Sequence, residues 1–165
     1  MNQPLIWVLA DDRAGNRAQC LGVADRLGIP YETKEIRYNT LVKLPNSLRG
    51  ATLIGVDGDS AASLKAPWPD VVIAAGRRTA PIARYIKRKH PDAKLVQLMW
   101  PDAAPEEFDC IVLPSHDRDH GEAENILRVL GAPHRITASV LETARIQWRG
   151  PLSEYSTPRI ALIVG

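Results

Sequence analysis

The residues best suited to chemistry follow short apolar runs in the sequence. A Gly-Arg-Arg-Thr stretch comes directly after Val71–Ala75, whose β-branched and small side chains predict a buried strand. Gly76 permits a sharp turn, and Thr79 can cap a following helix. A helix start carries unpaired amide hydrogens and partial positive charge. With Arg77 and Arg78 beside it, this stretch predicts a site for a phosphate, a carboxylate or a polar sugar.

A purely structural interpretation of the same stretch stays open. Many α/β domains place glycine and polar residues after a strand only to turn the chain, and surface arginines usually point into solvent. Pro81 fits the first turn of a helix in either case, because its missing N–H costs little there. The ligand interpretation is supported by the preference of ligands for the carboxyl ends of strands in open α/β sheets.

A second polar loop, Asp-Asp-Arg-Ala-Gly-Asn, follows an apolar run at residues 5–10 that predicts the first buried strand. A helical pattern begins at Asn16 and stops at Gly28. If the two strands are parallel, Asp11, Asp12 and Asn16 lie at the same edge of the sheet as the arginine pair.

A third polar stretch, Pro-Ser-His-Asp-Arg-Asp-His-Gly, follows another predicted strand. His116 and His120 would bind a metal, with Asp117 or Asp119 beside them, only if a helix brought the two imidazoles to one face. The flanking proline and glycine predict a loop, so no metal is expected. Two interpretations of His116 stay open: a hydrogen-bonding or proton-transfer group, which suits neutral imidazole at physiological pH, and an ordinary loop histidine.

The elements around these loops alternate between strand and helix, as in an α/β domain. Helices are predicted over residues 80–89 and 139–148, and further strands over residues 31–38, 51–56, 94–99 and 108–113. Residues 125–130 fit a short strand or a helical turn, and the strand is favoured because Gly-Ala-Pro follows so soon. The charges within residues 31–38 predict an edge strand. The acidic turn at residues 57–60 is expected to cap a helix rather than bind a cation. The expected core contacts of the last helix are Val140, Leu141, Ala144 and Ile146.

Length and composition indicate one globular domain. The chain has 165 residues, 45% of them hydrophobic and 24% charged, which argues against disorder. Its net charge of +2 comes from 21 basic and 19 acidic residues that are interspersed, so no nucleic-acid partner is expected. Cys20 and Cys110 lack metal-like spacing and are expected to be buried free thiols in a reducing compartment. Without a charged leader or a membrane-length apolar run we expect a cytoplasmic protein, and a peripheral contact with a membrane surface stays open.

The final residues predict another strand. Residues 158–165 have the composition of a buried strand arriving at a glycine turn, which a covering helix normally follows. This strand either opens a second domain or completes the same sheet. The favoured division is one domain over residues 1–150, followed by a linker and the first strand of a second domain over residues 151–165.

Three segments together resemble a known family: DDRAGNRAQCLGVADRLG, PDVVIAAGRRTAPIARYI, and FDCIVLPSHD before NILRVLGAPHRIT. They resemble the family named for a plant mitochondrial fission protein whose loss gives elongated mitochondria, and whose bacterial members are described as glycosyltransferases. The resemblance covers nearly the whole chain. It implies a Rossmann-like, mostly parallel sheet with helices on both faces, forming the amino-terminal, acceptor-side half of a B-type glycosyltransferase architecture.

The resemblance also implies site residues. Asp11 or His116 would remove a proton from an acceptor hydroxyl, and Arg77 and Arg78 would hold an anionic or sugar-containing acceptor. The other implied substrate-binding residues are Gly15, Asn16, Gln19, Gly76, Thr79 and Asp117. The nucleotide-sugar donor would bind to a carboxyl-terminal half, so the isolated chain is expected to be inactive and to hold no cofactor.

Two other function classes compete with the transferase. A non-catalytic binding or scaffold module that keeps the same sheet is the alternative to the transferase. A hydrolase is disfavoured because the sequence lacks GxSxG, a reactive CxxxxxR and a metal cluster. NAD and ATP are disfavoured because GxGxxG and a Walker-type lysine loop are missing.

Overall fold

The computed structural model describes residues 3–117, 120–121 and 123–162. It divides into two compact units, Met1–Arg135 and Ile136–Gly165.

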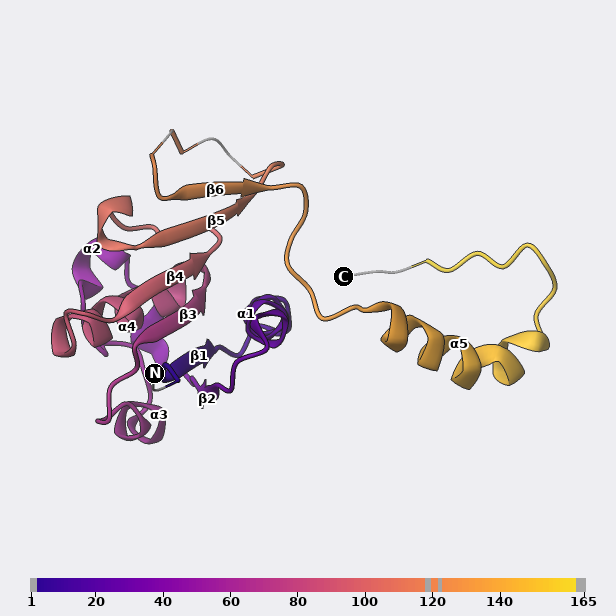
Figure 1. Cartoon of the computed structure of the whole chain (residues 1–165), viewed down its shortest axis with the longest axis horizontal. Helices are drawn as coiled ribbons and strands as arrows, with labels where there is room; N and C mark the ends of the chain where they lie inside the picture. Colours follow the sequence, from indigo (N-terminus) through magenta and orange to yellow (C-terminus); the bar gives the residue numbers. More distant parts are fainter. Residues whose placement is uncertain (1–2, 118–119, 122, 163–165) are drawn as a thin grey trace. The chain divides into compact units, whose positions relative to one another are not determined.

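The first unit is built on a parallel sheet (Figure 1). The described residues form six strands in the order β2-β1-β3-β4-β5-β6, and every neighbouring pair is parallel. The strands are β1 Ile6–Ala10, β2 Glu32–Glu35, β3 Val71–Ala75, β4 Lys94–Leu98, β5 Cys110–Pro114 and β6 Ile126–Val129. This is the Rossmann-like α/β fold expected from the sequence, and β2 is the edge strand that its charges predicted.

The order of the strands reverses between β1 and β3. From β1 the chain crosses through α1, Ala14–Leu27, to β2 on one side, and from β3 it crosses through α4, Gly76–Lys89, to β4 on the other. Because parallel crossovers are right-handed, opposite directions place the two helices on opposite faces of the sheet. The carboxyl ends of β1 and β3 therefore flank a topological switch point, where ligands of such sheets usually bind.

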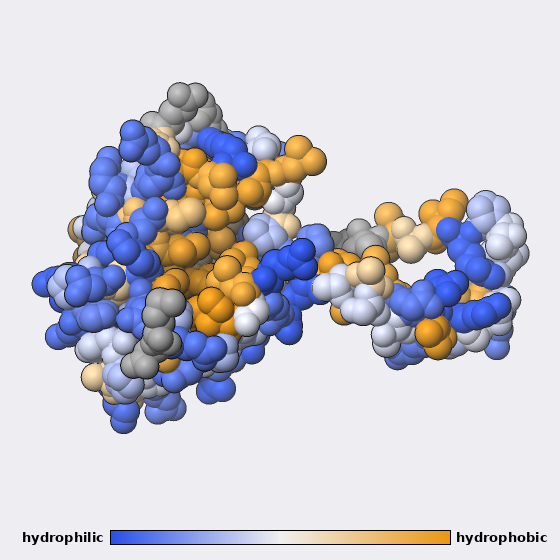
Figure 2. Space-filling model, viewed as in Figure 1, coloured by the Kyte–Doolittle hydropathy of each residue, from blue (hydrophilic) through white to orange (hydrophobic). Residues whose placement is uncertain are grey.

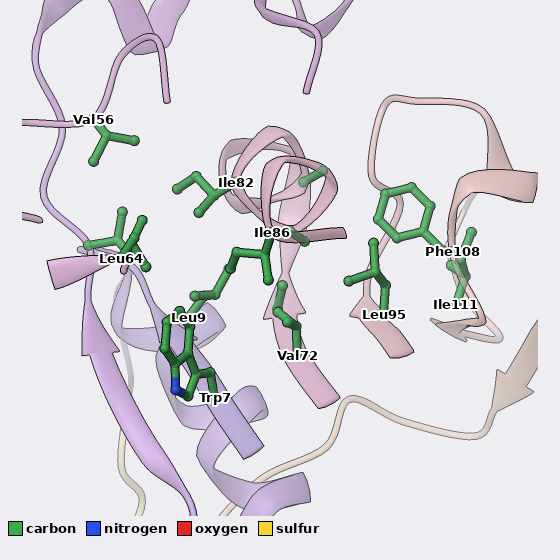
Figure 3. Packing of buried hydrophobic residues seen from close by; sticks show 14 of the residues in the cluster. Trp7, Leu9, Val56, Leu64, Val72, Ile82, Ile86, Leu95, Phe108 and Ile111 are labelled. Atoms are coloured by element: carbon green, nitrogen blue, oxygen red, sulfur yellow. The ribbon is translucent and has the colours of Figure 1, made fainter. Parts of the chain in front are cut away.

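Alternating strand residues build a separate core on each face. On the α4 face, Trp7, Leu9 and Val72 pack with Ile82 and Ile86 of the helix, and all five are buried (Figure 3). The other face buries Ile6, Val8 and Ile73 against α1 through Cys20, Leu21 and Ala24. Burial of one such aliphatic side chain stabilises the fold by about 1.5–3 kcal/mol. The sheet is thus held from both sides at the strands that carry the switch point.

The two cysteines are both free thiols, in different surroundings. Burial raises the pKa of Cys20 to about 12, so its thiol is neutral in the α1 core. The expected burial is confirmed for Cys20, whereas Cys110 is half-buried.

The connection from β2 to β3 contains short helices instead of a strand. These helices are η1 Thr40–Lys43, α2 Asn46–Arg49 and α3 Gly58–Ser63. Another short helix, η2 Pro105–Glu107, lies between β4 and β5. The strand predicted over residues 51–56 is wrong: only Val56 forms an isolated bridge, to Tyr38. Local turns satisfy the backbone instead, since the Thr52 hydroxyl donates to Arg49 O and accepts from Ile54 N. Asp57 caps α3 by accepting from Ser60 N at 2.7 Å, as predicted.

After β6 the chain is fixed against α1. A Cβ added to Gly22 would lie 2.7 Å from the carbonyl of His134, so only glycine permits this close approach. Asp25 of α1 accepts from Arg135 Nε at 2.7 Å and from the Tyr31 hydroxyl at 2.6 Å. These contacts anchor the last residues of the first unit.

The two edges of the sheet differ in polarity. Edge strand β2 reads Glu-Thr-Lys-Glu, which protects it from pairing with other chains. At the opposite edge, hydrophobic side chains reach the surface near β5 and β6 (Figure 2), where Leu127 is 54% exposed.

The second unit contains α5, Ala138–Ser153. The predicted helix is confirmed but continues through Gly150 and Pro151, so the division expected after residue 150 falls inside it. The helix has no buried residue, and three of the side chains expected to form core contacts, Val140, Leu141 and Ile146, are exposed. The described part of the predicted final strand, residues 158–162, is irregular, and residues 163–165 lie outside the described chain. Within the described residues, no helix has both the length and the apolarity needed to span a bilayer.

Candidate functional site

The first two polar loops of the sequence meet at the switch point. β1 and β3 are adjacent and parallel, with Val8 opposite Ile73, so both strands end at the same edge. Asp11 and Asp12 follow β1, and Gly76 begins α4 directly after β3. The predicted juxtaposition of the acidic loop with the arginine pair is therefore observed.

Gly76 makes the sharp turn that its position predicted. β3 passes into α4 with no intervening loop, and Gly76 has a φ of 70°, which disfavours side chains. The Asn16 amide lies against it, since an added Cβ would be 3.0 Å from Asn16 Nδ2. From the other side Gln97 Nε2 donates to Gly76 O at 3.0 Å. Amides from α1 and β4 thus hold the turn in place.

Asp11 is a buried carboxylate, 3% exposed. Its oxygens accept from Arg13 N at 3.0 Å and from Asn16 Nδ2 at 3.0 Å. Burial raises the pKa of Asp11 above its ordinary value, although both hydrogen bonds oppose the shift. The nearby Asp12 adds to the increase, and Arg78 lowers it. A carboxylate with a raised pKa at this edge is suited to accept a proton.

Arg78 joins the two loops. Its Nη1 donates to Asp12 Oδ1 at 2.8 Å, and its guanidinium carbon lies 5.6 Å from the centre of the Tyr38 ring. The Tyr38 hydroxyl is buried and has no hydrogen-bond partner within the described chain. Burial raises the pKa of Tyr38, and Asp11 raises it further, so this hydroxyl stays protonated.

The start of α4 is braced from behind by α2. Asn46 Nδ2 donates to Arg77 O at 2.7 Å and to Pro101 O at 2.8 Å. Pro81 lies six residues into α4, not in the first turn as expected, and its missing N–H leaves Arg77 O without the usual helical donor. The Asn46 amide supplies the replacement.

Arg49, also in α2, is only 1% exposed. Its Nη2 donates to Arg78 O at 3.3 Å and its Nε to Ile54 O at 3.0 Å. Burial lowers the pKa of Arg49, and Arg77 and Arg78 lower it further. It forms no ion pair with a carboxylate of the described chain, so it adds positive charge beneath the arginine pair. We refer to the following residues as the switch-point cluster: Asp11, Asp12, Asn16, Tyr38, Arg49, Gly76 and Arg78.

Thr79 does not cap the helix. Because α4 begins at Gly76, Thr79 lies within the first turn and is fully buried. Its hydroxyl donates back to Ala75 O at 2.8 Å, so the predicted cap is wrong and the side chain supports the strand-to-helix turn. The residue before the helix, Ala75, forms no side-chain cap.

The remaining candidates near the cluster are Gly15, Gln19 and Arg77. Gly15 lies in the first turn of α1, and no atom approaches within 4 Å of a Cβ placed there. Gln19 lies against the end of β4, with Nε2 3.7 Å from Met99 Sδ, and its buried Oε1 has no partner in the described part of the chain. The Arg77 side chain is exposed at the start of α4.

His116 and Asp117 lie at the same edge of the sheet but away from the cluster. They follow β5, three strands from β1, which corresponds to about 14 Å at ordinary strand spacing. The His116 side chain is 71% exposed, with Nε2 3.9 Å from Asp117 Oδ1. Asp117 lines a separate cavity of about 910 Å³, together with Ser115, Glu124 and Arg128. The structure therefore separates the two residues proposed as proton acceptors.

His120 contacts a ring and not His116. Its imidazole stacks on Trp100, with centroids 3.9 Å apart and planes at 2°. Among the described residues, no group of three His, Cys, Asp or Glu side chains could hold a metal ion. Asp119 lies outside the described chain.

Three residues of this site escaped the sequence interpretation. Tyr38 ends an expected strand, and Asn46 and Arg49 lie in what reads as an irregular connection. No local pattern marks Asn46 and Arg49 as parts of the site, because the α4 carbonyls to which they donate, Arg77 O and Arg78 O, lie 31 and 29 residues away. Pro81 gives one indication. Because it lies inside α4 and has no N–H, Arg77 O needs a hydrogen-bond donor from another element.

Comparisons with known proteins give one family. A sequence model of the family described as mitochondrial fission ELM1 matches residues 14–165. A protein of Rickettsia prowazekii (strain Madrid E), named uncharacterized protein RP120, is 45% identical over 114 residues, which are 68% of this chain and 32% of that protein. The match thus spans about a third of the relative's length. No solved structure matches the chain significantly.

Proposed function

Because the chain belongs to the mitochondrial fission ELM1 family, we propose that it is the acceptor-binding half of a glycosyltransferase of the two-domain B type. The acceptor binds at the switch-point cluster through an anionic or sugar group. The nucleotide-sugar donor is held by a second Rossmann-like half.

The observation that carries this proposal is the buried carboxylate of Asp11 beside the arginine-rich start of α4. Burial raises the pKa of Asp11, and a carboxylate of raised pKa is a better base toward a hydroxyl. Arg77 and Arg78 lie within the first turn of α4, where positive charge and helix amides together favour an anion. The same edge thus offers a base and an anchor for an acceptor.

The proposed reaction transfers one sugar. Asp11 takes the proton of an acceptor hydroxyl as its oxygen bonds to the anomeric carbon of the donor sugar. The bond from that carbon to the diphosphate oxygen breaks, and its electron pair leaves with the nucleoside diphosphate. Asn16, through its hydrogen bond to Asp11, holds the carboxylate in one orientation.

The test is an Asp11→Asn variant of the intact protein. Nucleoside diphosphate release is measured with uridine, guanosine and thymidine diphosphate sugars as donors and hexose phosphates as acceptors. Loss of a general base should lower turnover by about 100-fold or more, with little change in KM.

The matched control is Asp92→Asn, an exposed aspartate between α4 and β4 at the opposite edge of the sheet. It should keep full turnover. Equal activity of Asp11→Asn and the unaltered protein would remove Asp11 from the mechanism.

A non-catalytic binding module is the second candidate, and α5 favours it. No residue of α5 is buried, and Leu141, Ile146 and Trp148 are exposed, as on a helix that packs against a partner. Replacing Arg77 and Arg78 by alanine separates the two functions. If sugar transfer continues unchanged while recruitment of a partner protein fails, the transferase proposal is wrong.

A further inference from the structure

The guanidinium of Arg78 already has an anionic partner, and that partner is exposed. Arg78 Nη1 lies 2.8 Å from Asp12 Oδ1, through one hydrogen bond. The Asp12 side chain is 54% exposed and the Arg78 side chain 23%. A single exposed contact of this kind is weak, and it leaves most of the guanidinium donors for another acceptor.

The backbone of Arg78 is fixed while its side chain is held at one point. Its carbonyl accepts from the buried Arg49, and the carbonyl before it accepts from Asn46. The guanidinium, by contrast, is hydrogen-bonded to Asp12 alone among the described residues, and it lies over the Tyr38 ring. Rotation of the Arg78 side chain therefore requires no movement of α4.

The surroundings favour an anion over the present arrangement. Arg77 and Arg78 both lie close enough to Arg49 to lower its pKa, so three guanidinium groups gather here, and the start of α4 has neither a side-chain cap nor an acidic residue in its first turn. The Arg78 guanidinium lies over the ring of Tyr38, whose hydroxyl is a buried donor without a partner in the described chain. Asp12 supplies one exposed carboxylate to a region with several donors.

We propose that Asp12 stands in for the anionic group of the acceptor, and that Arg78 exchanges Asp12 for this group when the acceptor binds. A phosphate or carboxylate takes the place of the Asp12 carboxylate on Arg78 and uses the donors at the start of α4. Once the guanidinium leaves the Tyr38 ring, the ligand also accepts a hydrogen bond from the Tyr38 hydroxyl. This inference rests on the proposed function, since it assumes an anionic acceptor at this site.

The experiment is a double-mutant cycle on binding in the whole chain. Asp12→Asn, Arg78→Gln and the double variant are titrated with inorganic phosphate and with glucose 6-phosphate, and binding is followed by amide chemical shifts in NMR spectra. Uncharged glucose is the control ligand. Because the pair is exposed, all three variants should stay folded, which thermal unfolding checks.

Removing the competing carboxylate should tighten phosphate binding about two- to fivefold, the range expected for an exposed ion pair. Arg78→Gln should weaken it about tenfold, and Asp12→Asn should then have no further effect in that background. An equal gain from Asp12→Asn with or without Arg78 would mean simple charge repulsion and would overturn the exchange.

Tyr38→Phe gives an independent readout. Removing a hydroxyl without a protein partner should leave thermal stability equal or higher, and should weaken glucose 6-phosphate binding several-fold if the ligand uses it. A lower stability with unchanged binding would assign the hydroxyl to the fold and contradict the proposal. If none of the variants nor the unaltered chain binds either phosphate, both the exchange and the anionic acceptor are wrong.

Discussion

Asp11 and Asp109 lie at opposite edges of the sheet, and their pKa values are shifted in opposite directions. At the carboxyl edge, burial raises the pKa of Asp11. At the amino edge, Asp109 has a lowered pKa, because hydrogen bonds from Leu95 N, Lys94 and Lys87 outweigh its partial burial. Its side chain is 28% exposed, and the three donors lie 2.9, 3.0 and 3.2 Å away. At the amino edge, hydrogen bonds stabilise the ionised carboxylate of Asp109. At the carboxyl edge, burial favours the protonated form of Asp11.

This difference in pKa distinguishes a carboxylate that stabilises the fold from one that suits a ligand site. The ion network around Asp109 ties the start of β4, the start of β5 and the end of α4 together. The switch-point cluster instead buries Asp11, Arg49 and the Tyr38 hydroxyl with incomplete pairing. Incomplete pairing of buried charged and polar groups is typical of ligand sites, which supports the proposal that the acceptor binds at this edge.

The largest expected effect is a loss of stability when the support of α4 at the switch point is removed. Asn46→Ala removes one buried and one partly buried hydrogen bond, and leaves Pro101 O and Arg77 O without that donor. We expect the free energy of unfolding to fall by about 2–3 kcal/mol. Urea unfolding measures it, with exposed Ser47→Ala as the neighbouring control. A loss as small as that of the control would show that α2 does not brace α4.

The next largest effect is on the stability that the ionised Asp109 gives at the amino edge of the sheet. Asp109→Asn should lower the free energy of unfolding by about 1 kcal/mol at neutral pH, since the pair is partly screened. A lowered pKa gives stability that is present above the unfolded value of 3.8 and is lost as pH falls through the folded value. The difference between variant and unaltered chain should therefore close in acid. A difference that persists there would contradict an ionic origin.

Asp11→Asn should have the opposite sign. A raised pKa means that stability is fully present below the unfolded value of 3.8 and is lost as pH rises through the folded value. At neutral pH the amide should thus raise the free energy of unfolding by about 0.5–1 kcal/mol, even as turnover is lost. Chemical unfolding at neutral and acid pH measures this. If the variant is destabilised at neutral pH, the predicted contrast between Asp11 and Asp109 is wrong.

The smallest effect concerns Gly15. Its replacement by alanine meets no atom within 4 Å and should stabilise α1 by about 0.5 kcal/mol. If the glycine leaves room for the acceptor, glucose 6-phosphate binding should weaken in the same variant. Thermal unfolding and NMR titration measure the two effects. A stabilised variant with unchanged binding would show that Gly15 takes no part in the site.

Much of the architecture was predictable because it depends on local pattern. Continuous apolar runs predicted five of the strands, and the glycine after Val71–Ala75 predicted the turn into α4. The family expected from the three motifs is confirmed by the match over residues 14–165. The strand over residues 51–56 failed because side-chain hydrogen bonds of Thr52 compete with sheet pairing, which apolar pattern does not register.

The site was predictable in part. Asp11 and Arg78 could be placed at one edge because parallel strands end together. The positions of Asp117 and His116 relative to them depend on strand order, which periodicity leaves open. The apolar residues of α5 show the same limit, since the pattern gives a helix with an apolar side but not what contacts it.

By itself, then, the sequence determined the six strands of the sheet, the polar loops after them and the family. These features depend on hydrophobic periodicity and turn residues, which involve positions close together in the chain. Only the tertiary structure decided that Tyr38, Asn46 and Arg49 belong to the site and that β5 lies three strands from β1. Hydrogen bonds to backbone carbonyls and the burial of charge arise when distant segments pack together, and the residue types alone do not specify which segments those are.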